Sequence, residues 1–310
     1  MTARTILITA IVLLFSVSLW ANRWMGESDR AAVAAGDSHR IISMAPSITE
    51  TLYALGLGDR VVGVTRYCAY PPEVAQKNRT GGYYDPNFEA MVRLHPDLIV
   101  MLDDHWQSLP EFQKLHIPVL VVSHRTVEGI LDSFRTIGRI AGREEAGRRL
   151  AQQYTQRLQA IRRRTEGKSC PRVLLALDRT FGRGQLADVY LAGVDGYFDR
   201  ILQWAGGQNA YQQRGVRNPI VSPEGIAWLN PEVIVDLAPK KVVDDLGRSA
   251  IVADWSSLPR VEAVRRHRVF VIDQDYALVP GPRFIRLVED LAELLHPDAK
   301  KPAAGEGRKS

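Results

Sequence analysis

Most of the short motifs that signal an enzyme are missing from this chain of 310 residues. It has no GxxxxGK[ST] phosphate-binding loop, no GxSxG nucleophile elbow and no HExxH zinc motif. Its two cysteines, Cys68 and Cys170, form no CxxC pair, which argues against a thiolate metal site. The seven histidines do not cluster. Because no nucleophile–base–acid set can be read from the sequence, it favours a binding protein over an enzyme.

Long runs of charge of one sign are also missing. The composition is ordinary for a globular protein, with 45% hydrophobic and 24% charged residues, and the net charge is +5. No long basic run is interleaved with aromatic residues, so the basic balance is weak evidence for nucleic acid, and no such partner is expected. The two cysteines lie far apart in sequence, which leaves open whether they pair.

An apolar run near the N-terminus points to export. The fifteen residues from Ile6 to Trp20 follow a positively charged start, and such a run is short for a membrane span but typical of a signal-peptide core. We therefore expect residues 1–21 to be a signal peptide or an uncleaved N-terminal anchor, and residues 22–38 to be a linker. No cysteine follows the run, which argues against a lipid anchor. In a bacterium the remaining chain would be periplasmic, either free or tethered to the inner membrane.

One stretch of the chain occurs twice, with the pattern E-x-x-x-x-L-[HN]-P-[DE]-[LV]-I-V. The copies are FEAMVRLHPDLIV at 88–100 and PEGIAWLNPEVIV at 223–235, a constant offset of 135 because 223 − 88 = 135. Each copy predicts a short helix with an acid in its first turn, a stop at a proline and a buried parallel strand. Residues of N-cap type, Asn87 and Ser222, precede the two helices. A unit repeated at this spacing predicts two similar lobes.

A long segment between the two copies divides the chain. Residues 143–166 contain no proline and place apolar residues at helical spacing, which predicts one helix of about 35 Å at a rise of about 1.5 Å per residue. We therefore expect an α/β protein with two similar Rossmann-like lobes, residues 39–142 and 167–296, joined by this long helix. Residues 297–310 are expected to be a disordered tail.

This organisation resembles the class III periplasmic substrate-binding proteins, which serve ABC importers of cobalamin, ferric siderophores and haem. The resemblance covers about Arg40 to His296. It is carried by RIISMAPSITETLYALG, the VTRYCAYPPE loop, the twin units and the PGPRFI helix start. The resemblance implies a monomeric protein with no enzymatic activity and no cofactor, which holds a small-molecule metal chelate in a cleft between the lobes. It also implies a partner, an ABC permease dimer with its ATPase subunits.

The resemblance further assigns a role to one glutamate in each lobe. In this family an exposed glutamate of each lobe docks on arginine pockets of the permease, and the motif places these residues at Glu89 and Glu224. Carboxylate–guanidinium pairs suit this role because they are bidentate and directional. The residues by themselves also allow a simpler interpretation, in which both acids interact favourably with helix N-termini.

The resemblance places the ligand against loops that follow the first strands of each lobe. A planar macrocycle favours aromatic faces and few charges. Each aromatic residue in these loops is explained equally well by core packing, and the arginine by a salt bridge to an acid such as Asp275. The residues expected to contact the ligand are Tyr67, Tyr83, Tyr84, His105 and Trp106 in the first lobe, and Phe181, Tyr190, Tyr276 and Arg283 in the second.

The identity of the ligand stays open between two kinds of chelate. The aromatic, modestly charged loops resemble the cobalamin branch most, although an aromatic residue is expected there near Asn218-Pro219. A ferric siderophore or haem is the alternative, because phenolate oxygen binds ferric iron and haem binders of the class often use a tyrosine in the loop that here holds Tyr83 and Tyr84. Two other functions are weaker alternatives: a chelatase-like enzyme, which needs a His/Glu set in the cleft, and an anchored sensor of the same ligand.

Overall fold

The computed structural model describes residues 38–298, without the side chains of residues 106–108. The predicted signal peptide or anchor, almost all of the linker and most of the predicted tail lie outside these residues. Within the described range, none of the helices has the length and apolarity that a membrane span requires.

Lobe one is built on a five-stranded parallel sheet with the strand order β3-β2-β1-β4-β5. Its strands are β1 (Ile41–Ser43), β2 (Val61–Val64), β3 (Asn78–Arg79), β4 (Leu98–Leu102) and β5 (Val119–Val122). Its helices are α2 (Pro46–Ala54), α3 (Phe88–Arg93), α4 (Leu109–Gln113) and α5 (Val127–Ile140), with 3-10 turns at Gly58–Arg60, Pro72–Gln76 and Asp103–Ser108.

Lobe two is built on a mixed sheet with the strand order β11-β10-β6-β7-β9, and β8 pairs with β6. The strands are β6 (Arg172–Arg179), β7 (Val189–Leu191), β8 (Gln208–Asn209), β9 (Ile220–Val221), β10 (Val233–Leu237) and β11 (Val269–Ile272). The helices are α7 (Tyr197–Trp204), α8 (Pro223–Leu229), α9 (Lys240–Leu246), α10 (Arg248–Trp255), α11 (Glu262–Arg265) and α12 (Phe284–Leu295). Because β7 and β9 run antiparallel to their neighbours, this sheet is not fully parallel.

The twin units of the sequence occupy matching places in the two lobes. The side chain of Asn87 accepts a hydrogen bond from the backbone N–H of Ala90 at the start of α3, and Ser222 accepts one from Gly225 at the start of α8. The strands that follow, β4 and β10, are buried at every position and pair in parallel with their neighbours. Both N-caps and both buried strands are therefore as predicted.

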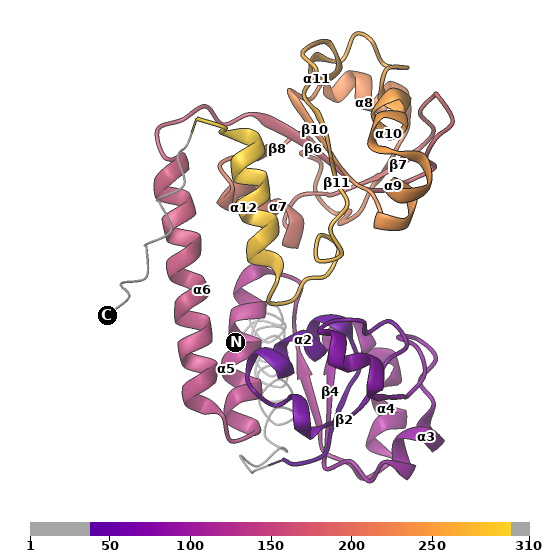
Figure 1. The fold of residues 1–310 in the computed structure, drawn as a ribbon, viewed down its shortest axis with the longest axis vertical. Coiled ribbons are helices and arrows are strands. Elements are labelled where there is room, and N and C mark those ends of the chain that lie inside the picture. Colours follow the sequence, from indigo (N-terminus) through magenta and orange to yellow (C-terminus); the bar gives the residue numbers. More distant parts are fainter. Residues whose placement is uncertain (1–37, 299–310) are drawn as a thin grey trace, which may run out of the picture.

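A spine of three helices connects the lobes (Figure 1). The longest is α6 (Glu144–Thr165), which packs along α5 and α12. All three helices contribute to one hydrophobic core that also holds residues of the lobe-two sheet. A Cβ on Gly147 would come within 2.4 Å of the backbone oxygen of Phe134, so α5 and α6 approach as closely as glycine allows. The predicted architecture of two α/β lobes joined by a long helix is confirmed.

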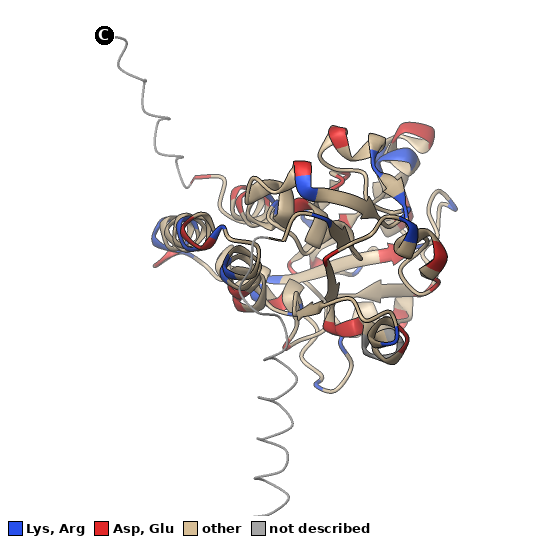
Figure 2. Cartoon of the chain, turned by 90° about the horizontal axis from the view of Figure 1, so that it is seen from below, with Lys and Arg blue, Asp and Glu red and all other residues tan. Residues whose placement is uncertain are grey.

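Basic and acidic residues are both spread along the chain. In the cartoon of Figure 2, backbone positions of Lys and Arg and positions of Asp and Glu are scattered over many elements. This agrees with the absence of long charged runs in the sequence.

Candidate functional site

The nominated ligand residues share one topological position, the carboxyl edges of the two sheets. Those of lobe one follow β2, β3 and β4, while Phe181 and Tyr276 follow β6 and β11. Tyr190 of β7 pairs with Asp178, next to the last residue of β6. These two edges face one another, since the loop after β11 reaches α2, which directly follows β1 (Figure 1). Ligands of open α/β sheets bind outside the carboxyl ends of the strands. The arrangement therefore brings the candidate residues of both lobes toward one region.

Arg283 joins the lobes instead of remaining open to a ligand. Its Nε and Nη2 atoms donate to Glu50 of α2 at 3.0 and 2.8 Å, and Nη1 donates to both oxygens of Asp275 at 2.7 Å. The Arg283–Glu50 pair is buried, whereas the Asp275 side chain is 64% exposed. The ring of Tyr70 covers the guanidinium, with its centroid 3.9 Å from Cζ. We call this group the interlobe clasp.

Burial dominates the electrostatics of the clasp. It raises the pKa of the Glu50 carboxyl, against the hydrogen bonds and charge of Arg283, which lower it. The salt bridge to Asp275 that the sequence allowed is present, and the buried contact to Glu50 was missed. In the sequence, Glu50 falls among apolar residues at helical spacing. A buried acid needs a partner, and this was the only sign of the contact that the sequence offered.

An aromatic cluster lies at the carboxyl edge of lobe one. The rings of Tyr83 and Tyr84 meet edge to face at 4.7 Å, and the centroid of Tyr83 is 3.9 Å from that of His105. Tyr84 is 82% exposed. Burial raises the pKa of Tyr83, and the nearby charge of Asp104 raises it further, so its hydroxyl stays protonated at neutral pH. The side chain of Trp106 is outside the described set.

His105 packs against Tyr83 of this cluster. The sequence predicted that His105 faces a ligand, whereas its side chain is buried in this conformation. It is buried, and its Nδ1 accepts a hydrogen bond from the backbone N–H of Leu102 at 3.0 Å. Burial lowers its pKa, so the ring is neutral at neutral pH with its proton on Nε2. In this conformation Nε2 is buried and has no hydrogen-bond partner among the described side chains. The ring therefore positions Tyr83 rather than presenting a nitrogen to the surface.

The remaining candidates divide into exposed and buried side chains. Tyr67 and Tyr190 are exposed, and Tyr190 lies beside the exposed Ile220 on the neighbouring strand. Tyr276 is buried in the lobe-two core and donates its hydroxyl proton to Asp290, which explains why it is not open to a ligand. Phe181 is half-buried, with the guanidinium of Arg179 at 4.5 Å over its ring.

Three arginines near this region have acidic partners. Arg179 is buried and pairs with Asp236 at 2.8 Å and Asp254 at 2.7 Å. In lobe one, Arg66 pairs with Asp85, and Arg125 contacts the two acids that follow β4, Asp103 and Asp104. Their positive charge is therefore largely compensated.

A buried histidine supports α2 from the side of β5. His124 forms hydrogen bonds of 2.9 Å to the hydroxyls of Ser47 on α2 and Ser133 on α5. Burial lowers its pKa to about 4. A Cβ on Gly281 would lie 3.0 Å from Cα of Ser47, so the loop that carries the clasp arginine rests against the same turn of α2.

Metal-ligand chemistry is sparse in the described part of the chain. Residues 38–298 hold no group of three or more His, Cys, Asp or Glu placed to bind a metal ion. Cys68 is buried and Cys170 is exposed, and neither is in a disulfide, which settles the pairing that the sequence left open.

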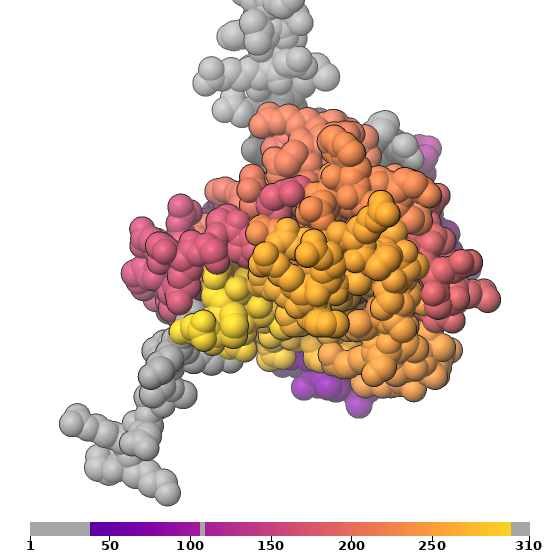
Figure 3. Space-filling model, turned by 90° about the horizontal axis from the view of Figure 1, so that it is seen from above, coloured from indigo at the N-terminus to yellow at the C-terminus, as the bar shows by residue number. Residues whose placement is uncertain are grey.

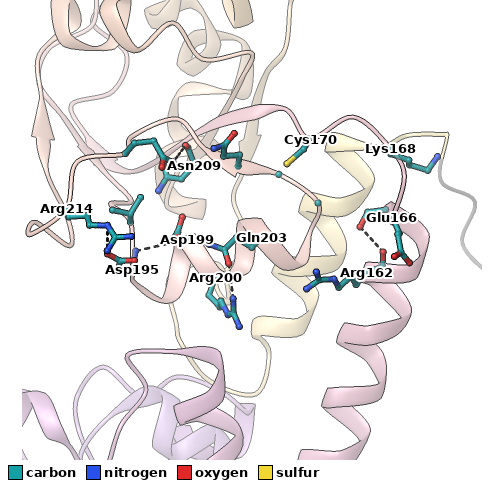
Figure 4. Close-up of a pocket in the computed structure, with 16 residues that line it drawn as sticks. Arg162, Glu166, Lys168, Cys170, Asp195, Asp199, Arg200, Gln203, Asn209 and Arg214 are labelled. Carbon is teal, nitrogen blue, oxygen red and sulfur yellow. Dashed lines mark hydrogen bonds and ion pairs between the residues drawn. The ribbon is translucent and has the colours of Figure 1, made fainter.

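A separate hollow lies in lobe two, between the end of α6 and α7 (Figure 4). Its volume is about 630 Å³. Its polar groups satisfy one another: Asp199 accepts from Gln203, Arg200 donates to Gln203, and Arg214 pairs with Asp195. None of the residues that line this hollow is aromatic, which distinguishes it from the carboxyl edges.

The predicted docking glutamates lie on the ends of the molecule, away from the facing edges. Helix α3, which carries Glu89, precedes β4 at one end, and α8, which carries Glu224, precedes β10 at the other (Figure 1). Both side chains are exposed. Glu89 forms an ion pair with Arg93 one turn along the helix. A hydrogen bond from its own backbone N–H lowers the pKa of Glu224, and one from Ser222 adds to this effect.

Comparisons with known proteins agree on one family. The profile described as periplasmic binding protein matches residues 41–276. The uncharacterized ABC transporter substrate-binding lipoprotein YvrC of Bacillus subtilis is 30% identical over 277 residues, which cover 84% of this chain and 81% of YvrC. The vitamin B12-binding protein of Vibrio cholerae is 26% identical over 264 residues, covering 83% of this chain and 89% of that protein.

A solved structure shows the same arrangement of lobes. The periplasmic heme-binding protein RhuT from Roseiflexus sp. RS-1, in its apo form, superimposes with a TM-score of 0.71 at 25% identity. The match covers 85% of this chain and 100% of RhuT. The similar proteins thus differ in what their names say they bind.

Proposed function

Because the chain belongs to the periplasmic binding protein family and is a substrate-binding component of an ABC transporter, we propose that it captures a cobalamin-like corrinoid between its lobes and delivers it to a membrane permease. The chain is then exported, and its N-terminal segment is either cleaved or retained as a tether. One similar protein is named for vitamin B12 and another for heme, so these are the two ligands that an experiment has to distinguish.

The observation that carries the proposal is the set of exposed tyrosines on facing edges. Tyr67 and Tyr84 of lobe one and Tyr190 of lobe two present aromatic surface from the two lobes. The aromatic faces suit a large planar ring with few charges. A corrinoid also brings its own nitrogen ligands, so its recognition does not require a metal site in the protein.

Compensated arginines disfavour an anionic siderophore. Recognition of a multiply charged anion calls for unpaired guanidinium groups. Three arginines near the facing edges, Arg66, Arg125 and Arg283, are each paired with at least one carboxylate. A neutral amide-rich chelate avoids the cost of displacing these partners.

Haem is the second candidate, and it rests on one exposed residue. Tyr84 lies in the loop after β3, and its side chain is more exposed than that of the neighbouring Tyr83. Tyr83 is less suitable as an iron ligand because its raised pKa opposes the phenolate form. A haem complex would therefore be expected to depend on Tyr84.

The experiment is an absorption measurement after desalting the purified protein with cyanocobalamin, haemin or a ferric siderophore. The proposal predicts retained corrinoid colour, and a loss of about 10-fold or more in affinity on combining Tyr84→Ala and Tyr190→Ala, as removal of stacked aromatics does elsewhere. Trp228→Ala, an exposed aromatic at the far end of lobe two, is the matched control and leaves binding unchanged. If the protein instead retains haem but no corrinoid, and the haem band is lost in Tyr84→Phe, the ligand is haem and the corrinoid proposal is wrong.

The proposal extends to delivery by the two end glutamates. Glu89 and Glu224 lie on opposite ends of the molecule, one from each lobe, as a receptor that bridges two permease subunits requires. Charged pairs at such an interface orient the complex and accelerate association. The double variant Glu89→Ala/Glu224→Ala should bind ligand normally and fail in uptake. Uptake that persists in this variant would refute docking through the glutamates and would favour an anchored sensor.

A further inference from the structure

The outer face of α8 exposes a tryptophan beside Glu224. Trp228 is 80% exposed, and the two residues are four apart, which places them on the same helix face. The opposite face of the helix is fixed, because Ile226 and Leu229 are buried in the lobe-two core. Figure 3 looks onto this end of the molecule, where orange segments of lobe two form the surface. We call Glu224, Ala227 and Trp228 the lobe-two end face.

The matching surface of lobe one has different chemistry. An offset of 135 relates Glu224 to Glu89 and Trp228 to Arg93, because 224 − 89 = 228 − 93 = 135. Arg93 pairs with Glu89 and is exposed, so the acid of lobe one is partly neutralised by its own helix. Within the described part of the chain no basic side chain forms an ion pair with Glu224. Each end thus carries a glutamate, but its neighbour one turn along the helix is Trp228 in lobe two and Arg93 in lobe one.

From this contrast we propose that Trp228 and Glu224 together are the main anchor for a permease subunit, and that the Glu89 end makes the weaker contact. The inference rests on the proposed function and adds to it an apolar contact and an unequal engagement of the two lobes. The surface it fits on the permease is a shallow apolar pocket with a basic side chain at its rim.

The chemistry of the end face selects this occupant. An isolated exposed tryptophan gains free energy only when a partner covers it, and tryptophans of this kind dominate the affinity of many interfaces. The exposed arginines Arg265 and Arg266 lie beyond the C-cap of α8, so a lipid surface is the alternative that the vesicle experiment below tests. A second copy of this chain in a symmetric contact through the end face would bring two Glu224 carboxylates close together, which is unfavourable. A protein partner with a basic rim meets both requirements.

The test measures uptake of labelled cyanocobalamin in cells in which the chromosomal copy of the gene is replaced by variants of the full chain. Trp228→Ala is expected to lower the initial uptake rate about 10-fold or more at limiting receptor, whereas Trp228→Phe should lose about 3-fold or less. Arg93→Ala is the comparison on lobe one, and it should raise uptake by freeing Glu89 from its ion pair. Glu224→Ala should reduce uptake more than Glu89→Ala does.

Binding assays on the same purified variants separate this inference from the proposed function. If the wild-type protein neither binds cyanocobalamin nor supports its uptake, the proposed function fails. If it does both, but Trp228→Ala takes up cyanocobalamin within 2-fold of the wild type, or Glu89→Ala is the more damaging variant, the unequal anchor is wrong. Trp228-dependent dimerisation in sedimentation velocity, or Trp228-dependent flotation with phosphatidylglycerol vesicles, would also overturn it by assigning the face to a second copy or to lipid.

Discussion

The buried histidine beneath α2 makes the stability of the fold depend on pH. His124 has a folded pKa of about 4, whereas an unfolded chain has about 6.5 for histidine. Since the folded pKa is the lower one, the unfolded state binds a proton first as the pH falls, and stability that is complete above pH 6.5 is lost toward pH 4. A difference of about 2.5 units at about 1.36 kcal/mol per unit gives about 3.4 kcal/mol in total, of which about 2.5 kcal/mol is lost by pH 4.5.

The assay is urea unfolding of the wild type and of His124→Gln between pH 7 and pH 4.5, followed by tryptophan fluorescence. Glutamine keeps a donor and an acceptor for Ser47 and Ser133 but does not titrate. Other titrating groups affect both proteins alike, so the difference between the two unfolding free energies isolates His124. The wild type should lose about 2.5 kcal/mol more than the variant over this range. A difference that stays constant within about 0.5 kcal/mol would show that His124 titrates normally, and the reasoning from burial would be refuted.

Three further predictions follow from the clasp, the spine and the cysteines. Glu50→Ala leaves the buried clasp arginine with one exposed partner and should cost about 2–4 kcal/mol of unfolding free energy in urea, whereas Asp275→Asn should cost under about 1 kcal/mol; equal effects would contradict the assigned burial. Gly147→Ala forces a methyl group against a backbone carbonyl of α5 and should lower stability by about 1–3 kcal/mol, measured by thermal unfolding against an exposed α6 alanine variant as the control. A thiol reagent should modify Cys170 in the folded protein and Cys68 only after unfolding, because burial shields Cys68 and raises its pKa; fast labelling of both would contradict the buried position.

The repeated unit was predictable because its signals are local. Asn87 and Ser222 act through hydrogen bonds within three residues, and the apolar runs of β4 and β10 identify themselves as strands buried on both faces. The antiparallel strands β7 and β9 were not predicted, since runs of three and two residues carry too little periodicity.

The place of the nominated residues in the fold was predictable, but the state of each side chain was less so. The sequence placed the tyrosines in loops after strands, and the topology puts those loops at the facing carboxyl edges. It could not separate the exposed Tyr84 from the buried Tyr276, whose hydroxyl is held by Asp290 on a distant helix turn. The contact between Arg283 and Glu50 spans 233 residues, and no local pattern encodes such a pair.

The interlobe clasp makes the first step of separating the lobes the most costly one. Its hydrogen bonds of 2.8 and 3.0 Å resist a small displacement, since a buried charge that loses its partner is costly. Once the lobes separate far enough for water to enter, hydration replaces the lost contacts and the resistance falls. A partner that opens the molecule therefore needs to supply a brief displacement, not a sustained force.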